Sequence, residues 1–152
     1  EAGDLQSICR RILVMAAEDV GLAYPQAIVI TKACVDAALQ LGFPEARIPL
    51  AEAVIMLATA PKSNSVICAI DDAISDIQSG NMGDIPPHLK DAHYSGAQKL
   101  GHGSGYKYPH SYPNNYVKQQ YLPDTLKDSK YYVPGKNKLE SQTEKYWNEI
   151  KK

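Results

Sequence analysis

Hydrophobic residues in positions 1 to 80 recur three and four positions apart, which is the spacing of one face of an α-helix. The first such pattern begins at Leu5 and ends before Gly21, where a helix is expected to stop. A second lies between Pro25, which suits a first helical turn, and Gly42, which suits a left-handed C-terminal cap. Its apolar residues fall on several sides, which predicts a central helix.

The next two patterns predict the helices that complete the first half of the chain. Pro49 is expected to open a third helix and Pro61 to stop it. A fourth runs from a cap at Ser63 or Asn64 to Gly80, with a polar face rich in aspartate. Its apolar face consists of Val66, Ile67, Ile70, Ala73, Ile74 and Ile77. Short connections and many alanines favour close packing, so we predict an all-α fold, a compact bundle of about four core helices.

The pattern changes in residues 81 to 136, where Pro, Gly and Asn are so frequent that only one short helix fits, before residue 101. Nine of the ten tyrosines lie in this second half of the chain, and disordered chains are poor in aromatics. The segment is therefore expected to be irregular but ordered, wrapped over the helical core with tyrosine rings as anchors. Asn137 as a cap, with Glu140 three positions later, indicates a final helix over residues 137 to 151.

These parts together predict a single domain over residues 1 to 152, with a helical core over residues 1 to 80. No apolar run approaches the roughly 20 residues that a membrane-spanning helix needs, and the N-terminal residues do not resemble a secretory signal. A soluble intracellular protein without a membrane partner is expected. The cysteines form no CxxC and lie in apolar helical patterns, so they are interpreted as buried free thiols rather than reactive ones. They are Cys9, Cys34 and Cys68.

Candidate chemistry centres on "KLGHGSGYKYPHSY", residues 99 to 112. Its glycines could hold a phosphate or form a structural turn, but no GxxxxGK[ST] motif occurs and no helix is expected to follow. The spacing of the histidines matches no zinc site, and no serine or cysteine has the context of a nucleophile. We therefore predict no catalytic residue, no metal site and no cofactor in this chain. The histidines considered are His88, His93, His102 and His110.

The two halves differ in charge. Residues 1 to 80 carry five Lys and Arg against ten Asp and Glu, whereas the later residues carry eleven Lys, no Arg and seven acids. Lysine neutralises phosphates and tyrosine stacks on unpaired bases, so the second half is either a nucleic-acid-binding face or an ordinary lysine-rich surface. The absence of arginine, whose planar fork suits phosphate, counts against the first alternative. The possible DNA contacts are Lys99, Lys107 and Lys118.

Five blocks that occur in order carry a resemblance to a known family. They are "AAEDVGLAYPQA" (16 to 27), "LGFPEARIPLAEAVIMLATAPKSNSV" (41 to 66), "PPHLKDA" (86 to 92), "LGHGSGYKYPH" (100 to 110), and "QQYLPDTL" followed by "YYVPG" (119 to 135). Together they resemble the C-terminal region of the RarA/MgsA family of replication-associated recombination proteins, whose eukaryotic relatives include the Werner-helicase-interacting protein. The resemblance extends from about Leu5 to Trp147.

This resemblance implies a function for the chain. Members of the family are AAA+ ATPases related to clamp loaders, and their C-terminal region is an all-helical domain that assembles homotetramers. They act on DNA at stalled forks in company with single-stranded-DNA-binding protein, in the cytoplasm and associated with the nucleoid. The ATPase domain, which binds ATP and Mg²⁺, is absent from this chain, so the fragment itself is expected not to be an enzyme.

The family's motifs fall on residues that we interpret as structural or interaction residues. They are Glu18, Asp19, Pro44, Glu45, Lys62, Asn64, Gly101, Gly103, Tyr106, Lys107, Tyr108, His110 and Tyr121. The leading hypothesis is an oligomerisation domain of a clamp-loader-like ATPase. The alternative is a DNA-binding or partner-binding module that uses the half rich in lysine and tyrosine. A third hypothesis, a metal- or phosphate-dependent enzyme, has the least support.

Overall fold

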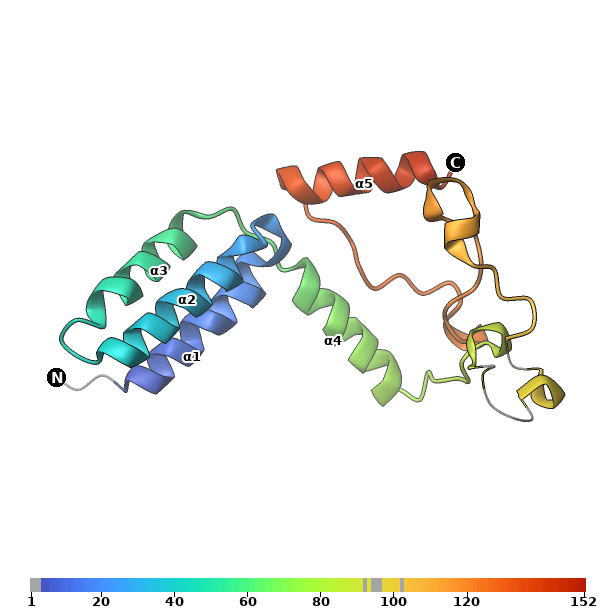
Figure 1. Ribbon diagram of the computed structural model, residues 1–152, viewed down its shortest axis with the longest axis horizontal. Coiled ribbons are helices and arrows are strands. Elements are labelled where there is room, and N and C mark those ends of the chain that lie inside the picture. Colours follow the sequence, from blue (N-terminus) through green and yellow to red (C-terminus); the bar gives the residue numbers. More distant parts are fainter. Residues whose placement is uncertain (1–3, 92, 94–96, 102) are drawn as a thin grey trace. The chain divides into compact units, whose positions relative to one another are not determined.

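The computed structural model describes residues 4–91, 93, 97–101 and 103–152 (Figure 1). Every regular element in these residues is a helix or a helical turn, so the predicted all-α fold class is confirmed. None of the described helices is long and apolar enough to cross a membrane.

Contacts between residues divide the chain into two compact units. Unit 1 comprises Glu1–Ile70 and Tyr132–Glu144, and unit 2 comprises Asp71–Tyr131 and Lys145–Lys152. The boundaries fall inside two helices, α4 and α5, so neither unit is a continuous piece of the chain. The helices that cross the boundaries are α4 (Ser65–Gln78) and α5 (Lys138–Ile150).

Three helices lie side by side in unit 1 and supply its apolar core (Figure 1). They are α1 (Leu5–Met15), α2 (Gln26–Leu41) and α3 (Arg47–Thr59). α1 continues into a π-helical turn, Ala16–Val20, and then a 3₁₀ turn, Gly21–Ala23. The core residues are Cys9, Ile12, Ala16, Val20, Ala27, Cys34, Val35, Ala38, Ala46, Leu50, Ala53 and Leu57. The small alanines among them let the helices approach closely.

The ends of α2 follow from the residues that flank it. Pro25 precedes its first residue, and Gly42 follows its last residue with a φ of 67°, as the sequence predicts. α3 begins at Arg47, two residues before the predicted start at Pro49. Pro49 is tolerated there because the N–H groups of a first helical turn have no acceptor within the helix.

The cysteines differ in burial. Cys9 and Cys34 are buried, as predicted, and burial raises the pKa of both thiols. The prediction was wrong for Cys68, which is exposed. Cys68 follows Val66 by two residues, which corresponds to about 200° around a helix, so it points away from the apolar face of α4.

The apolar face of α4 is largely exposed. Val66, Ile70, Ile74 and Ile77 are 43%, 53%, 42% and 56% exposed, and Ser65 is the buried residue of the helix. The sequence predicts a fourth core helix here, whereas the apolar core of unit 1 comes from the three preceding helices and the turns beside them. Four large aliphatic side chains along one face of α4 are therefore exposed to solvent.

The described residues between 81 and 131, in unit 2, are irregular apart from short 3₁₀ turns. These turns are Pro87–Leu89, Ala97–Leu100, Pro109–Ser111, Pro113–Asn115 and Asp124–Leu126. The first two replace the one short helix predicted before residue 101. Bonds between distant residues hold the segment in place: the Thr125 hydroxyl donates to the Met82 carbonyl at 3.1 Å, and His88 Nε2 lies 2.8 Å from the Gln120 carbonyl oxygen.

Two tyrosines of the irregular segment contact helical residues within unit 2, whereas packing of the segment over the helical core stays a prediction. In unit 2, the Tyr131 hydroxyl donates to the Asp76 carboxylate at 2.9 Å. The ring of Tyr116 meets Trp147 edge-on, with ring centroids 6.0 Å apart. Both tyrosines thereby connect the irregular segment to residues of a helix.

A buried carboxylate joins the beginning of α4 to the beginning of α5 within unit 1. Glu140 is 1% exposed and accepts hydrogen bonds from the Ser65 hydroxyl at 2.6 Å and the Tyr132 hydroxyl at 2.9 Å. The Asn137 amide also donates to it, and Asn137 Oδ1 accepts from the Glu140 N–H at 3.0 Å. The predicted cap of α5 is thus confirmed. The carboxylate of Glu140, which belongs to this cap, also accepts from residues outside it, Ser65 and Tyr132.

The protonation states of this cluster follow from its contacts. Burial by itself raises the pKa of Glu140, but hydrogen bonds outweigh burial and lower that pKa to about 2. The donors are Ser63, Ser65, the Gly135 N–H and Asn137. Burial, together with the hydrogen bond to Glu140, raises the pKa of Tyr132 to about 12. With these two pKa values, the carboxylate of Glu140 is ionised and the phenol of Tyr132 that donates to it is neutral.

Gly135 leaves room for the carboxylate of Glu140 in the buried cluster. A Cβ at this position would lie 2.7 Å from Glu140 Oε2 and 3.1 Å from the Ser63 hydroxyl oxygen. Only a residue without a side chain lets the backbone approach the buried cluster this closely.

Replacing Glu140 by Ala is expected to lower the free energy of unfolding by about 2–4 kcal/mol, because several buried donors lose their acceptor. Urea denaturation followed by circular dichroism measures this change. Glu144→Ala is the matched control, since Glu144 is exposed on the same helix, and should change stability by less than about 0.5 kcal/mol. Equal losses in the two variants would contradict the assigned role of Glu140.

The lowered pKa of Glu140 predicts a dependence of stability on pH. Because the folded-state pKa lies below the ordinary value of 4.5, the carboxylate contributes its stabilisation above about pH 4.5 and loses it as pH falls toward 2. The Glu140→Gln variant lacks this titration and should lose less stability over the same range. Urea midpoints measured for both proteins between these pH values test the prediction, and parallel curves would contradict it.

Candidate functional site

In unit 1, the turn that follows α1 packs against the segment that precedes α4. The Ser63 N–H donates to the carbonyl of Asp19 at 2.9 Å. Gly21 has a φ of 45°, and a Cβ there would lie 2.8 Å from the carbonyl oxygen of Ser63, so the close approach requires glycine. This contact brings the predicted candidates Asp19, Lys62 and Asn64 together.

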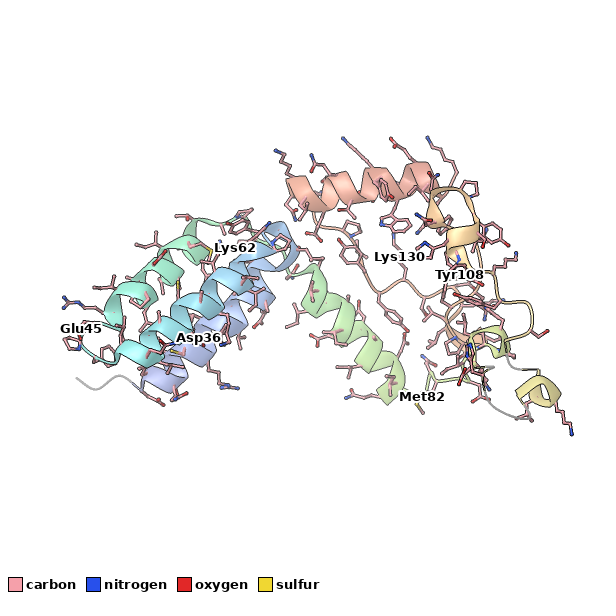
Figure 2. The ribbon with its side chains drawn as sticks, viewed as in Figure 1. Asp36, Glu45, Lys62, Met82, Tyr108 and Lys130 are labelled. Carbon is pink, nitrogen blue, oxygen red and sulfur yellow. The ribbon has the colours of Figure 1, made fainter. Side chains whose placement is uncertain are left out.

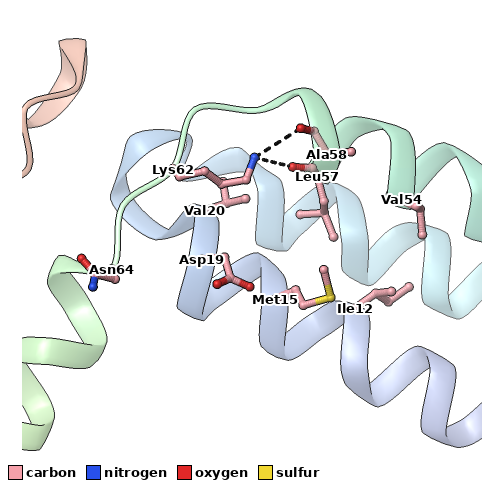
Figure 3. Close-up of a pocket in the computed structure, with 9 residues that line it drawn as sticks. All are labelled: Ile12, Met15, Asp19, Val20, Val54, Leu57, Ala58, Lys62 and Asn64. Carbon is pink, nitrogen blue, oxygen red and sulfur yellow. Dashed lines mark hydrogen bonds between the residues drawn. The ribbon is translucent and has the colours of Figure 1, made fainter.

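A groove of about 470 Å³ opens between α1 and α3 beside this contact (Figure 3). Its lining is mainly apolar and carries Asp19, Lys62 and Asn64 at one end. The apolar lining consists of Ile12, Met15, Val20, Val54, Leu57 and Ala58. Met15 and Val54 are 37% and 49% exposed, so the groove is open to solvent. Such a lining suits the apolar side chains of a partner segment rather than a polar substrate.

Lys62 is held by the C-terminal end of α3. Its ammonium donates to the carbonyls of Leu57 at 2.8 Å, Ala58 at 3.4 Å and Ala60 at 2.5 Å (Figure 3 draws the first two). Carbonyls of a last helical turn lack donors within the helix, and a cation there also stabilises the negative end of the helix dipole. The position of Lys62 in the predicted motif is therefore explained by helix capping.

The other candidate site residues in the first half of the chain do not line this groove. Pro44 and Glu45 are exposed in the turn between α2 and α3, where the Phe43–Pro44 peptide bond is cis. Figure 2 shows Glu45 and Lys62 at opposite ends of α3. Glu18 is half-buried in the π-helical turn. The structure therefore does not bring all the predicted motifs into one site.

The glycine- and tyrosine-rich candidates lie in unit 2. Gly101 and Gly103 adopt φ values of 70° and 71°, as expected for a turn, and the Gly103 N–H donates to the Pro87 carbonyl at 2.9 Å. The aromatic candidates Tyr106, Tyr108 and Tyr121 are 47%, 57% and 53% exposed. Also exposed are Lys99, Lys107, Lys118 and His110.

The described residues contain no group of three or more His, Cys, Asp or Glu side chains that could hold a metal ion. His88 faces the Gln120 carbonyl, and His93 Nδ1 lies 2.7 Å from the carboxylate of Asp91. His102, considered with them in the sequence, lies outside the described residues. His88 and His93 therefore have partners within the chain.

The site predictions missed two residues whose side chains join separate segments through hydrogen bonds. Glu140 was predicted only as part of a helix cap, and its bonds to Ser65 and Tyr132 have no local signal in the sequence. Gln119 bridges Lys107 and Tyr121: its side-chain amide donates to the Lys107 carbonyl at 2.9 Å and to the Tyr121 hydroxyl oxygen at 3.0 Å. Neither spacing nor residue type points to this bridge.

The whole chain is similar to one family of proteins. The family model described as MgsA AAA+ ATPase C terminal matches residues 1–151. Replication-associated recombination protein A of Bacillus subtilis is 57% identical over 153 residues, which cover 100% of this chain and 36% of that protein. The Escherichia coli protein of the same name is 35% identical, covering 92% of this chain and 32% of that protein. ATPase WRNIP1 of Dictyostelium discoideum is 31% identical, covering 82% and 14%. The chain therefore spans only about a third, or less, of the length of these relatives.

The capping role of Lys62 predicts that Lys62→Ala lowers the free energy of unfolding by about 1 kcal/mol. Urea denaturation measures the loss. Lys32→Ala serves as the matched control, because Lys32 forms only an exposed i,i+4 pair with Asp36 and should contribute less than about 0.5 kcal/mol. A Lys62 variant as stable as the Lys32 variant would show that the cap is energetically unimportant.

Proposed function

Because the chain belongs to the MgsA AAA+ ATPase C-terminal family, we propose that it is the self-association domain of a AAA+ ATPase that acts in replication-associated recombination. ATP and Mg²⁺ belong, in this proposal, to the ATPase part of a longer clamp-loader-like protein. DNA and single-stranded-DNA-binding protein are partners of that longer protein. The contribution of this chain is to hold several ATPase parts together in a homotetramer.

The observation that carries the proposal is the exposed apolar face of α4. Val66, Ile70, Ile74 and Ile77 are all between 42% and 56% exposed. A contiguous row of large aliphatic side chains is uncommon on the surface of a protein that functions as a monomer. Covering the exposed part of each side chain in a contact would contribute about 1 kcal/mol per residue, roughly half the value for full burial.

The spacing on α4 also suits contact with another helix. Val66, Ile70, Ala73 and Ile77 are four, three and four positions apart, which is the spacing of a seam between packed helices. Acidic residues of α4, such as Asp71 and Asp72, are exposed and border this row. A narrow apolar seam with a charged border is typical of an interface between soluble chains.

Self-association would serve the longer protein through effective concentration. Closed symmetric assemblies are the usual form of soluble homo-oligomers, and each linked ATPase part raises the local concentration of the others. Weak contacts of single ATPase parts with one DNA structure would then act together.

Light scattering across a dilution series tests the proposal. The unmodified chain is expected to have a mass near four protomers, and the double variant Ile70→Asp with Ile74→Asp is expected to have the mass of one. The double variant places two charges in the middle of the apolar row, where burial of an unpaired charge is costly.

The matched control is Ser75→Asp, which adds a charge to an exposed position of the same helix. It should keep the mass of the unmodified chain. A monomeric unmodified chain would contradict self-association. An assembly that survives the double variant would contradict the role of α4, provided that circular dichroism shows equal helix content in all three proteins.

A further inference from the structure

A stretch of unit 2 combines exposed tyrosines and lysines and contains no acidic residue in its sequence. Between Asp91 and Asp124 the sequence contains no Asp or Glu, although it contains three lysines and six tyrosines. Six exposed side chains of this stretch make up what we call the tyrosine–lysine surface. It consists of Tyr106, Lys107, Tyr108, His110, Lys118 and Tyr121. A surface that attracts anions and also offers aromatic faces is unusual, because most lysine-rich surfaces carry interspersed acids.

The tyrosine–lysine surface is held together by Gln119. Its side-chain amide donates to the carbonyl of Lys107 at 2.9 Å, and its side-chain oxygen accepts from the N–H of Lys107 at 3.2 Å. The same amide donates to the hydroxyl oxygen of Tyr121 at 3.0 Å. One side chain thus joins the backbone at Lys107 to the hydroxyl of Tyr121, whose ring remains 53% exposed.

The rings of Tyr108 and His110 also support one another. Their centroids are 5.1 Å apart, with an angle of 47° between the ring planes, while Tyr108 stays 57% exposed. An aromatic ring that is held in place but left open loses little conformational entropy when a flat partner stacks on it.

We propose that the tyrosine–lysine surface binds single-stranded DNA. The exposed rings would stack on unpaired bases, and Lys107 and Lys118 would contact phosphates. Base-on-ring stacking tolerates any sequence because each base has a flat face, and lysine contacts the backbone without reading bases. The absence of arginine in this half, which counts against base-specific recognition, is compatible with this mode.

The neighbouring segment provides an internal comparison. Lys127 and Lys130 are also exposed, but Asp124 and Asp128 accompany them. Mixed charges of this kind keep a surface soluble without concentrating phosphates. The two lysine pairs therefore distinguish a binding surface from general attraction between a lysine-rich protein and DNA.

Fluorescence anisotropy of a short labelled oligothymidylate, titrated with the full chain, tests the proposal. Tyr108→Ala is expected to weaken binding by about fivefold or more, whereas Tyr108→Phe, which keeps the ring, should bind as the unmodified chain does. Because Tyr108 is largely exposed, both variants should unfold at the same urea concentration as the unmodified chain. A loss of binding shared by the Ala and Phe variants would overturn the stacking role.

The salt dependence of binding tests the lysines. Replacing Lys107 and Lys118 together by Gln should reduce the slope of log affinity against log salt by about 1.4, roughly 0.7 for each phosphate contact to a single strand. The control pair, Lys127→Gln with Lys130→Gln, removes the same charge and should reduce the slope less. Equal reductions would show that the attraction is general and would overturn the proposal. No binding by the unmodified chain would also overturn it and would direct attention to a protein partner for this surface.

Discussion

The buried carboxylate of Glu140 joins two segments that are far apart in the sequence, the start of α4 and residues 132 to 140. It receives hydrogen bonds from Ser65 at the start of α4, from Tyr132 in the segment before α5, and from Asn137 at the cap of α5. A charge that is 1% exposed is stable only when its hydrogen-bonding capacity is filled, and these donors fill it. The beginning of α4 is therefore fixed within unit 1, while its apolar side chains further along remain exposed.

α4 links the fold to the proposed function, because its first residue is fixed by Glu140 while its large aliphatic side chains are exposed. α1, α2 and α3 bury enough apolar surface to make a core by themselves, and they do so without the aliphatic residues of α4. Those residues are consequently free to contact another copy of the chain. The tyrosine–lysine surface belongs to unit 2 and uses different residues, so the proposed assembly and the proposed DNA contact can be tested separately.

Local signals in the sequence were sufficient for much of the helical structure. Pro25 and Gly42 set the ends of α2, and the pair Asn137 and Glu140 indicated α5, because capping depends on neighbouring residues. The start of α3 was misplaced because a proline fits several positions of a first turn. The burial of Cys68 was wrongly predicted because its neighbours in the sequence are apolar, although about 200° around α4 separates it from Val66.

Contacts between distant residues could not be predicted in the same way. The candidates Asp19 and Lys62 were found as separate motifs, but only the fold places them at one end of a groove. The bonds of Glu140 to Ser65 and of Gln119 to Lys107 join segments whose separation leaves no periodic signal. The amphipathic pattern of α4 was clear, yet a pattern of this kind is the same whether the apolar face is covered by its own chain or by a second copy.

The most direct measurement of the central claim is hydrogen–deuterium exchange of the backbone amides of α4, recorded at several protein concentrations. If α4 is the contact between copies, its amides should exchange more slowly as concentration rises, while the amides of α2, which contributes to the core of unit 1, should not change. Exchange of α4 that is independent of concentration, in samples whose mass does change, would contradict the assignment of the interface to this helix.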